Sequence, residues 1–432
     1  MTNGAEADSQ PRLQETLSKY GRFLEDHSGI FTAFREYELP WQSPIHLCAG
    51  ELKPEFCFST PRARPAISNR VRGAGDSALQ AKVSCLGEAL ERHSGIFRGD
   101  EPRRVARYSE IAGEAIHPDT LTLFSESQYN HREEWNRREG RYNWVPERFN
   151  KERSIDWSPV WSLTQQRTKY IPTAYCYFGY PFDPEHDFCR PDSNGNAAGN
   201  SADEAIVHGF LELVERECAS VWWYNQVRRP RVDIDSFGSP DVLAVRNLHR
   251  TIGRSVEVLD ITANRNIPTF VVVSRSEDPP RDDYTFGFGA HFDAQTALTK
   301  ALMELSQLSP VVLSGREPVC FLNTEPSQGD RSFLAPDDKL AATMRSDFYT
   351  SVSQEPNVLS CIEMVKSWGL EILVLDQTRE DIGMPVVKVV VPGMCSWWAR
   401  FANGRLYTLP VQIGWLSGPK TESELNSAHL IF

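Results

Sequence analysis

The chain has 432 residues, of which 40% are hydrophobic and 24% charged, and this composition is that of a globular protein. Its 46 basic and 58 acidic side chains give a formal net charge of −12. This acidic excess argues against a general nucleic-acid binder and against docking on an anionic membrane, because both functions need exposed basic groups. It leaves phosphate binding open, because metal ions can lie between two sets of negative charge.

The first ten residues, MTNGAEADSQ, are polar and form no signal peptide, and no apolar run reaches transmembrane length. The nine cysteines are scattered and include no Cys-x-x-Cys motif. This pattern is typical of reduced thiols, so we expect a cytoplasmic protein without a disulfide framework or a zinc site.

Strands mixed with long helices predict an α/β fold. We expect residues 1–60 to form an N-terminal segment that is partly disordered, above all in its first ten residues. Residues 61–432 are expected to form a single large domain of mixed sheet and long helices. The expected helices are Leu13 to Phe23, Ala78 to His93, Ala202 to Tyr224 and Ala294 to Gln307. The expected strands are Tyr170 to Tyr177, Val256 to Asp260, Thr269 to Ser274, Glu371 to Leu375 and Pro385 to Val391.

The three longest expected helices resemble one another, which predicts an internal helix repeat. Each follows a segment that contains glycine and that we interpret as a turn, namely Gly73-Ala-Gly75, Ala198-Gly-Asn200 and Gly287-Phe-Gly289. Each carries acidic or amide side chains three residues apart, namely Glu88 and Glu91, Glu212 and Glu215, and Glu304 and Gln307. The first two helices share the motif Glu-x-x-Glu-Arg in full.

A spacing of three places both carboxylates of a pair on one face of the helix. Like charges at this distance repel, and the apolar residues around each pair indicate that the helices are partly buried, so the carboxylates need a cation. Carboxylate oxygens are hard ligands that suit Mg²⁺, an ion often shared with nucleotide phosphates. The alternative is a solvated face or an ion-pair network in which Arg92 and Arg216 neutralise the glutamates.

The segment from Asp192 to Ser201 is dense in small and polar residues. Such a segment brings backbone N–H groups and amide side chains close to a ligand. The alternative is a turn followed by a helix cap at Asn200 or Ser201, and both interpretations are compatible. The phosphate-loop motifs of other nucleotide-binding proteins are missing from the sequence.

Four stretches in this order resemble the YcaO family, in particular its members that modify ribosomally made peptides. The resemblance runs from about Arg64 to Leu425. The stretches are Ser84-x-x-x-Glu88-x-x-Glu91-Arg92; Ser193-Asn-Gly-Asn196 with Glu212-x-x-Glu215-Arg216; Gly287-Phe-Gly-Ala-His291 with Glu304-x-x-Gln307; and Pro385 to Gly393 with Trp398-Ala-Arg-Phe401.

This resemblance implies an ATP site with Mg²⁺ and assigns residues to it. The implied Mg²⁺ ligands are Glu88, Glu91, Glu212 and Glu215. The implied ATP contacts are Ser84, Ser193, Asn196, Arg216, Glu304 and Gln307. The catalytic base stays unassigned, because the two candidates by position, His93 and His291, are lone histidines of the kind that is more often structural.

The resemblance also implies an ATP-dependent cyclodehydratase. A Cys, Ser or Thr side chain of a precursor peptide attacks the preceding backbone carbonyl, and phosphorylation of the oxygen by ATP lets it leave, which gives a thiazoline or oxazoline. A separate leader-peptide-binding partner protein is expected, and a homodimer is one option for assembly. The alternatives are the same activation leading to a thioamide or amidine, and a non-catalytic scaffold that binds a partner.

Three positions depart from the family pattern. The C-terminal segment, Asn426 to Phe432, lacks the prolines found in many relatives. Ala74 stands where many relatives have lysine, with Arg72 as a candidate substitute. Leu308 and Ser309 follow Gln307 where some relatives have arginine.

Overall fold

The computed structural model describes residues 3–25, 30–37, 45–53, 69–139, 143–181, 183, 186–264, 267–277, 284–307, 331–348, 357–402 and 404–430. The α-helices are α1 (Asn3–Tyr20), α2 (Ala78–Ser94), α3 (Tyr108–Ile111), α4 (Asp119–Thr122), α5 (Glu126–Asn130), α6 (Arg132–Arg138), α7 (Thr173–Cys176), α8 (Ala202–Asn225), α9 (Pro240–Thr251), α10 (Ala294–Gln307), α12 (Val358–Ser367) and α13 (Gly404–Gln412). The strands are β1 (Phe31–Tyr37), β2 (His46–Leu52), β3 (Arg70–Gly75), β4 (Arg104–Arg107), β5 (Ser154–Ser162), β6 (Arg167–Pro172), β7 (Asn196–Ala198), β8 (Arg254–Asp260), β9 (Thr269–Ser276), β10 (Tyr284–Ala290), β11 (Leu373–Asp376) and β12 (Val386–Val390).

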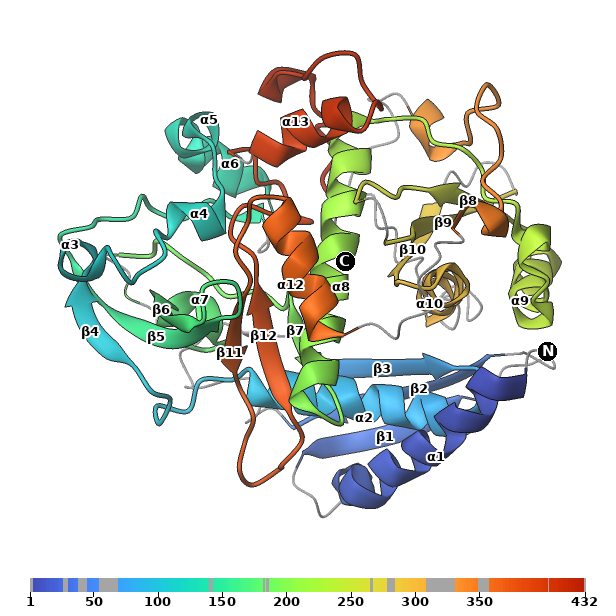
Figure 1. Cartoon of the computed structure of the whole chain (residues 1–432), viewed down its shortest axis with the longest axis horizontal. Coiled ribbons are helices and arrows are strands. Elements are labelled where there is room, and N and C mark those ends of the chain that lie inside the picture. Colours follow the sequence, from blue (N-terminus) through green and yellow to red (C-terminus); the bar gives the residue numbers. More distant parts are fainter. Residues whose placement is uncertain are drawn as a thin grey trace.

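The named strands form three sheets around the long helix α8 (Figure 1). Two sheets have three strands, in the orders β1-β2-β3 and β10-β9-β8. The third has the order β4-β5-β11-β12-β7, with β6 paired to β5. The pairings between named strands in the described ranges are all antiparallel. The α/β class is confirmed, and three antiparallel sheets take the place of the mixed sheet that we expected.

Helix α8 forms the centre of the main hydrophobic core. It begins after Ser201, whose side chain accepts a hydrogen bond from the backbone N–H of Glu204, which confirms the predicted cap. It ends at Gln226, which adopts a left-handed conformation with φ 52°. Its C-terminal half is apolar on nearly all sides, from Cys218 to Asn225, so this half lies fully inside the protein. Helices α12 and α13 and strands β12, β7 and β10 pack around it (Figure 1).

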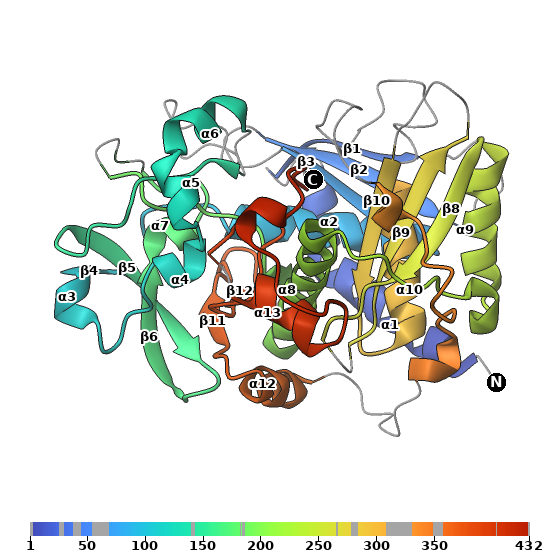
Figure 2. The ribbon, with the colours of Figure 1, turned by 90° about the horizontal axis from the view of Figure 1, so that it is seen from above.

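Helices α2 and α10 cover the two three-stranded sheets. Helix α2 packs against β3 and β2 and carries α1 on its outer side, whereas α10 packs against β10 and β9 (Figure 2). Helix α10 also contacts β3, so the two sheets meet beside α8. This arrangement brings α2, α8 and α10 together from three distant parts of the chain.

Two expected elements differ in the structure. The segment expected to be one strand from Tyr170 to Tyr177 divides at Pro172, where β6 ends and α7 begins. Proline has no N–H group to continue a strand ladder but suits the start of a helix, which explains the change. Helix α1 begins at Asn3, within the stretch that we expected to be disordered.

Strands β1 and β2 lie in the N-terminal segment that the sequence sets apart, and they join β3 in one sheet. None of the helices in the described ranges has both the length and the apolar character needed to cross a bilayer.

Candidate active site

Three glutamates, one from each of the three long helices, accept a hydrogen bond from a backbone N–H that precedes their helix. The Glu88 carboxylate of α2 accepts from Arg72 N at 2.6 Å. The Glu212 carboxylate of α8 accepts from Gly195 N at 2.9 Å. The Glu304 carboxylate of α10 accepts from Phe288 N. Each bond fixes a carboxylate between its helix and the preceding strand or loop, so the three helices present their acidic faces in the same way.

The glycines before α2 and α10 lie in strands, which corrects our interpretation of them as turns. Gly73 belongs to β3 and Gly289 to β10. A Cβ atom on Gly73 would lie 2.2 Å from Ala81 O, and one on Gly289 would lie 2.2 Å from Ala297 O. Glycine is required here because the strand backbone touches the helix backbone, and the two strand–helix units pack alike.

The second carboxylates on α2 and α8, those of Glu91 and Glu215, lie where burial and neighbouring negative charges disfavour ionisation. Burial, the charge of Glu212 and the charge of Glu88 raise the pKa of Glu91 well above its usual value. Burial and the charge of Glu212 raise the pKa of Glu215, against the effect of Arg216. The carboxylate of Glu91 accepts no hydrogen bond from any residue that the structure describes. Glu215 is paired with Arg216 and Glu88 with Arg92, whereas Glu91 has no ion pair among the described residues, as expected for a carboxylate that binds a cation.

The third helix extends the same acidic cluster. Burial and the charge of Glu215 raise the pKa of Glu304 to about 8. Desolvation lowers the pKa of Lys300, which is also on α10, and the nearby charges of Glu215 and Glu212 partly oppose this effect. The sequence interpretation missed Lys300, because nothing local separates it from an ordinary surface lysine.

Arg216 lies between two of the predicted metal ligands. Its guanidinium donates to Glu215 at 2.7 Å and to Glu212 at 3.0 Å, and it stacks 3.9 Å from the centre of the Trp397 ring. Arginine favours such a planar site because it can stack and donate at the same time. The arginine is thereby held in one orientation beside the carboxylates.

The segment before α8 is held by a buried lysine that sequence reasoning missed. Lys388 of β12 is 0% exposed, and its ammonium group donates to Asp192 O at 2.8 Å, Asn194 O at 3.0 Å and Asn196 Oδ1 at 3.2 Å. A lysine inside the apolar run from Val386 to Val390 was the available signal. This contact fixes the segment that contains Ser193, and Asn196 lies in β7 rather than in a loop.

The two remaining predicted residues are Ser84 and Gln307. Ser84 is exposed on α2. Gln307, at the end of α10, lines a small cavity of about 60 Å³ together with Arg72 and Gly73 of β3. The end of α10 that carries Gln307 therefore lies against β3, the strand that precedes α2.

The described residues contain no group of three or more His, Cys, Asp or Glu side chains close enough to hold one ion. The charges of the four predicted ligands affect one another's pKa values, but the four carboxylates do not surround a single position. Mg²⁺ is usually bound through one or two carboxylates, with waters and phosphates completing its shell, so pairs such as Glu88 with Glu91 and Glu212 with Glu215 fit the ion.

The two candidate histidines have environments that keep them neutral. Burial and the charge of Arg98 lower the pKa of His93 to about 4. Burial and the charge of Lys300 lower the pKa of His291 to about 4, and its Nδ1 accepts a hydrogen bond from Asp293 N at 3.0 Å. A neutral imidazole can accept a proton, but neither ring is placed against a reacting atom by the structure, so the base stays unassigned.

The C-terminal segment docks against α8 without prolines. Trp223 Nε1 donates to Ala428 O at 2.6 Å, His429 contacts Glu139 at 2.8 Å, and Leu430 is fully buried.

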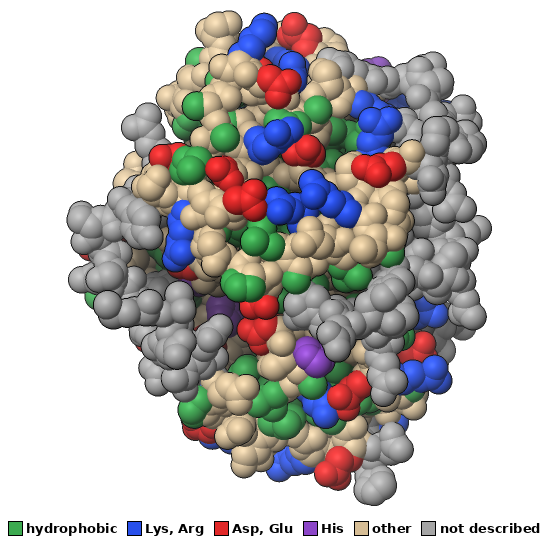
Figure 3. Space-filling model, turned by 90° about the vertical axis from the view of Figure 1, so that its right-hand side faces the viewer, with side chains coloured by type: hydrophobic (Ala, Val, Ile, Leu, Met, Phe, Trp, Pro, Cys, Tyr) green, Lys and Arg blue, Asp and Glu red, His purple; other side chains and the backbone are tan. Residues whose placement is uncertain are grey.

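Figure 3 shows the face formed by α9 and its neighbours, where described acidic and basic side chains are interspersed without a large basic patch.

The fold and this arrangement of carboxylates fit the class of proteins that bind Mg²⁺ together with a nucleotide, and comparison with known proteins gives the family. Residues 72–395 match the family model described as YcaO cyclodehydratase, ATP- and Mg²⁺-binding. The chain therefore belongs to the YcaO family, whose members bind ATP and Mg²⁺, and the predicted family and cofactors are confirmed.

Solved structures are similar over most of the chain. A heterocyclase in complex with substrate and cofactor is 38% identical with a TM-score of 0.89, and the match covers 97% of this chain and 57% of that one. The heterocyclase TruD is 44% identical with a TM-score of 0.74, over 82% of this chain and 51% of that one. This chain thus spans a little over half the length of both heterocyclases. YcaO from Methanopyrus kandleri, bound with AMPPCP and Mg²⁺, shares the fold at 20% identity and a TM-score of 0.63, over 89% of this chain and 92% of that one.

Proposed function

We propose that this chain is an ATP-dependent cyclodehydratase that converts Cys, Ser or Thr of a ribosomally made precursor peptide to thiazoline or oxazoline. The observation that carries the proposal is the convergence of α2, α8 and α10, each with a glutamate held by a backbone N–H and with neighbouring carboxylates that raise one another's pKa. Similarity to two heterocyclases supports the reaction type.

The proposed roles of the residues follow from their contacts. Mg²⁺ would be held by Glu88, Glu91, Glu212 and Glu215, and ATP would be contacted by Ser84, Ser193, Asn196, Arg216, Glu304 and Gln307. When bound, Mg·ATP supplies a phosphoryl group that turns an amide oxygen into a leaving group. Arg216, held by Trp397, would place a fixed positive charge beside the phosphates, and Lys388 would keep Asn196 in position.

The proposed internal helix repeat is supported by two shared features. The glutamate contact to a preceding backbone N–H recurs on all three helices, and the same glycine–helix contact recurs before α2 and α10. A separate leader-peptide-binding protein and a cytoplasmic location remain part of the proposal. The seven described cysteines are all buried and unpaired, as expected in a reducing compartment.

The test is incubation of the protein with a candidate precursor peptide, a leader-binding partner, ATP and Mg²⁺, read out by peptide mass and phosphate release. Loss of one water per ring indicates an azoline, whereas exchange of oxygen for sulfur indicates a thioamide. Glu91→Ala and Glu215→Ala should abolish both signals while circular dichroism stays unchanged. Glu363→Ala, at an exposed position of α12, is the matched control. Undiminished phosphate release in the first two variants would reject the site.

A further inference from the structure

A large cavity lies beside the acidic cluster, on the other side of the segment that Lys388 holds. It has a volume of about 930 Å³ and is bounded by α4, α7, the segment from residue 186 to 194, and the chain after β12. Of the ten predicted site residues, only Arg216 lines it. The cavity is therefore separate from the proposed ATP site but shares Arg216 with it.

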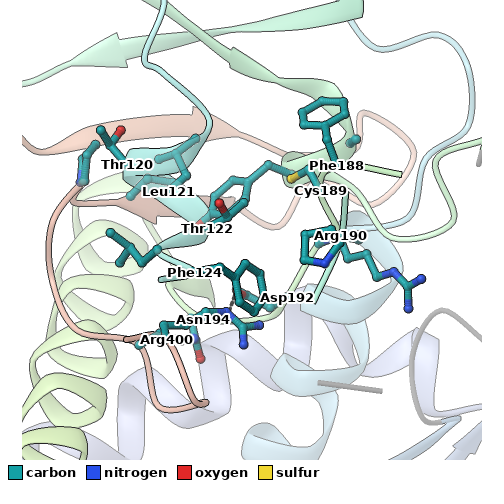
Figure 4. A pocket seen from close by; sticks show the side chains of 18 of the residues that line it. Thr120, Leu121, Thr122, Phe124, Phe188, Cys189, Arg190, Asp192, Asn194 and Arg400 are labelled. Carbon is teal, nitrogen blue, oxygen red and sulfur yellow. Dashed lines mark hydrogen bonds between the residues drawn. The ribbon is translucent and has the colours of Figure 1, made fainter. Parts of the chain in front are cut away.

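One short segment contributes residues both to the cavity and to the proposed ATP site. Asp192 and Asn194 line the cavity, whereas Ser193 and Asn196 are the predicted nucleotide contacts. Figure 4 shows Asp192, Asn194 and Arg400 close together at one end of the cavity, with Thr120 and Leu121 at another. A group in the cavity would thus lie next to the phosphate end of the proposed nucleotide site, where Arg216 is found.

The charged groups that line the cavity already have partners. Asp187 pairs with Arg190 at 2.6 Å, and Arg216 pairs with Glu212 and Glu215. The other lining carboxylates are paired as well, namely Asp156 with Arg103 at 3.1 Å, Asp183 with Arg153 at 3.0 Å, and Asp192 with Lys388 at 3.6 Å. A ligand that enters the cavity finds no unpaired carboxylate among these groups. The remaining charged side chain of the lining, Arg400, is partly buried and donates to Ala399 O at 3.1 Å, so a charged ligand would lose its hydration with little compensation.

The rest of the lining is mostly aromatic and aliphatic, with a few polar side chains such as Thr120, Asn194 and Ser396. Phe124, Tyr175, Phe188 and Trp398 contribute rings, and the residues from Val389 to Ser396 form a continuous part of the wall. The guanidinium of Arg400 stacks 4.1 Å from the Phe124 ring. Pockets with apolar walls and a few polar groups are typical of sites for uncharged organic groups.

We infer that this cavity binds the core segment of the precursor peptide, including the reacting Cys, Ser or Thr and its uncharged neighbours. The backbone amide to be activated would then lie beside Arg216, next to the phosphates of the nucleotide. The inference rests on the proposed function for the identity of the ligand. It adds a location for the peptide and a preference for uncharged residues next to the reacting one.

A photo-crosslinking experiment tests the location without requiring turnover. The probe is an uncharged synthetic peptide of alanine, valine and phenylalanine with a single cysteine and, next to it, benzoylphenylalanine. The probe is irradiated with the full-length protein and Mg·ATP, and the labelled segments are mapped by mass spectrometry. We expect labels in residues 120–124, 186–194 or 389–400. Labels confined to other segments, or no labelling at saturating probe, would overturn the inference.

A charge-swap experiment tests the preference. Thr120 is exposed and lines the cavity, so Thr120→Lys and Thr120→Asp add a charge at its mouth. With peptides that carry Asp, Lys or Ala beside the cysteine, Thr120→Lys should lower the KM of the Asp peptide and raise that of the Lys peptide at least several-fold, and Thr120→Asp should do the reverse. Thr408→Lys is the matched control, because Thr408 is also exposed with a hydroxyl bonded to a backbone carbonyl, and it lies outside the cavity.

The outcomes separate the two proposals. Ring formation with crosslinks outside the cavity rejects the peptide site and leaves the cyclodehydratase function in place. Crosslinks inside the cavity without ring formation or phosphate release reject the function and leave the peptide site. Equal KM values of the three peptides with the unmodified protein reject the preference for uncharged residues, and equal effects of Thr120→Lys on all three peptides reject the placement of the residue beside the cysteine at the mouth of the cavity.

Discussion

Glu217 and Arg405 form a two-pronged ion pair inside the core, with nitrogen–oxygen distances of 2.8 and 2.7 Å. Glu217 is 0% exposed and also accepts hydrogen bonds from Asn264 at 3.0 Å and from Cys395 N at 3.1 Å. Glu217 follows Glu215 and Arg216 on α8 but points into the core. The pair therefore connects the helix of the acidic cluster to α13 and to the chain that lines the large cavity.

We expect Glu217→Gln to destabilise the fold strongly, because it removes the buried carboxylate that neutralises the Arg405 guanidinium, whose side chain is only 17% exposed. Removing one partner of a buried pair costs about 3–5 kcal/mol. The free energy of unfolding, measured with urea, should fall by this amount. The control is Glu257→Gln, whose ion pair with Arg231 at 2.8 Å is well exposed and should contribute no more than about 1 kcal/mol. Equal losses in both variants would contradict the role of burial.

Gly289→Ala tests the contact between the backbones of β10 and α10. The new methyl group would lie 2.2 Å from Ala297 O and 2.6 Å from Ala301 N, so the helix must shift. We expect a loss of about 1–3 kcal/mol in stability, together with weaker nucleotide binding. Gly87→Ala is the opposite case, since nothing lies within 4 Å of its Cβ in α2, and it should stabilise the protein by about 0.5–1 kcal/mol. Thermal unfolding of both variants gives the comparison.

The raised pKa values predict that Mg²⁺ binding depends on pH. The metal needs ionised carboxylates, and the pKa values of its proposed ligands Glu91 and Glu215 are raised, as is that of the neighbouring ATP contact Glu304, to about 8. Affinity for Mg·AMPPCP should therefore increase from pH 6.5 to 8.5, with release of protons on binding. Calorimetry in two buffers of different ionisation enthalpy measures this release. Identical heats in both buffers at pH 7 would contradict the prediction.

The same groups affect the metal-free protein in the opposite direction. A carboxyl group whose pKa is higher in the folded state than in the unfolded state binds extra protons on folding. Its contribution to stability is present at low pH and is lost as pH rises from about 4.5 to about 8, the raised pKa of Glu304. Glu304→Gln should remove part of this pH dependence in urea titrations with EDTA present.

Lys388→Met tests the support of the segment before α8. Methionine fills similar space but leaves Asp192 O, Asn194 O and Asn196 Oδ1 without their donor, at a cost of about 1–3 kcal/mol for each buried group left unsatisfied. We expect lower stability and an increased Kd for Mg·AMPPCP. Val386→Met is the control on the same strand. Unchanged nucleotide affinity in Lys388→Met would show that Asn196 needs no such support.

The sequence by itself determined the helices and the chemistry on their faces. A spacing of three residues places Glu88 with Glu91, and Glu212 with Glu215, on one side of a helix whatever the rest of the chain does, because helix geometry is local. The cap at Ser201 and strands such as β8, β9 and β12 were predicted for the same reason, and the family followed from four motifs in order.

Only the tertiary structure decided which backbone N–H each glutamate meets, why Gly73 and Gly289 are glycines, and how Lys388 is neutralised. Each of these depends on contacts between residues far apart in the chain, and Lys388 meets acceptors almost 200 positions away. The cavity beside Arg216 is of the same kind, since its walls come from residues 105 to 400. Local patterns carry no information on such contacts, because packing between elements sets them.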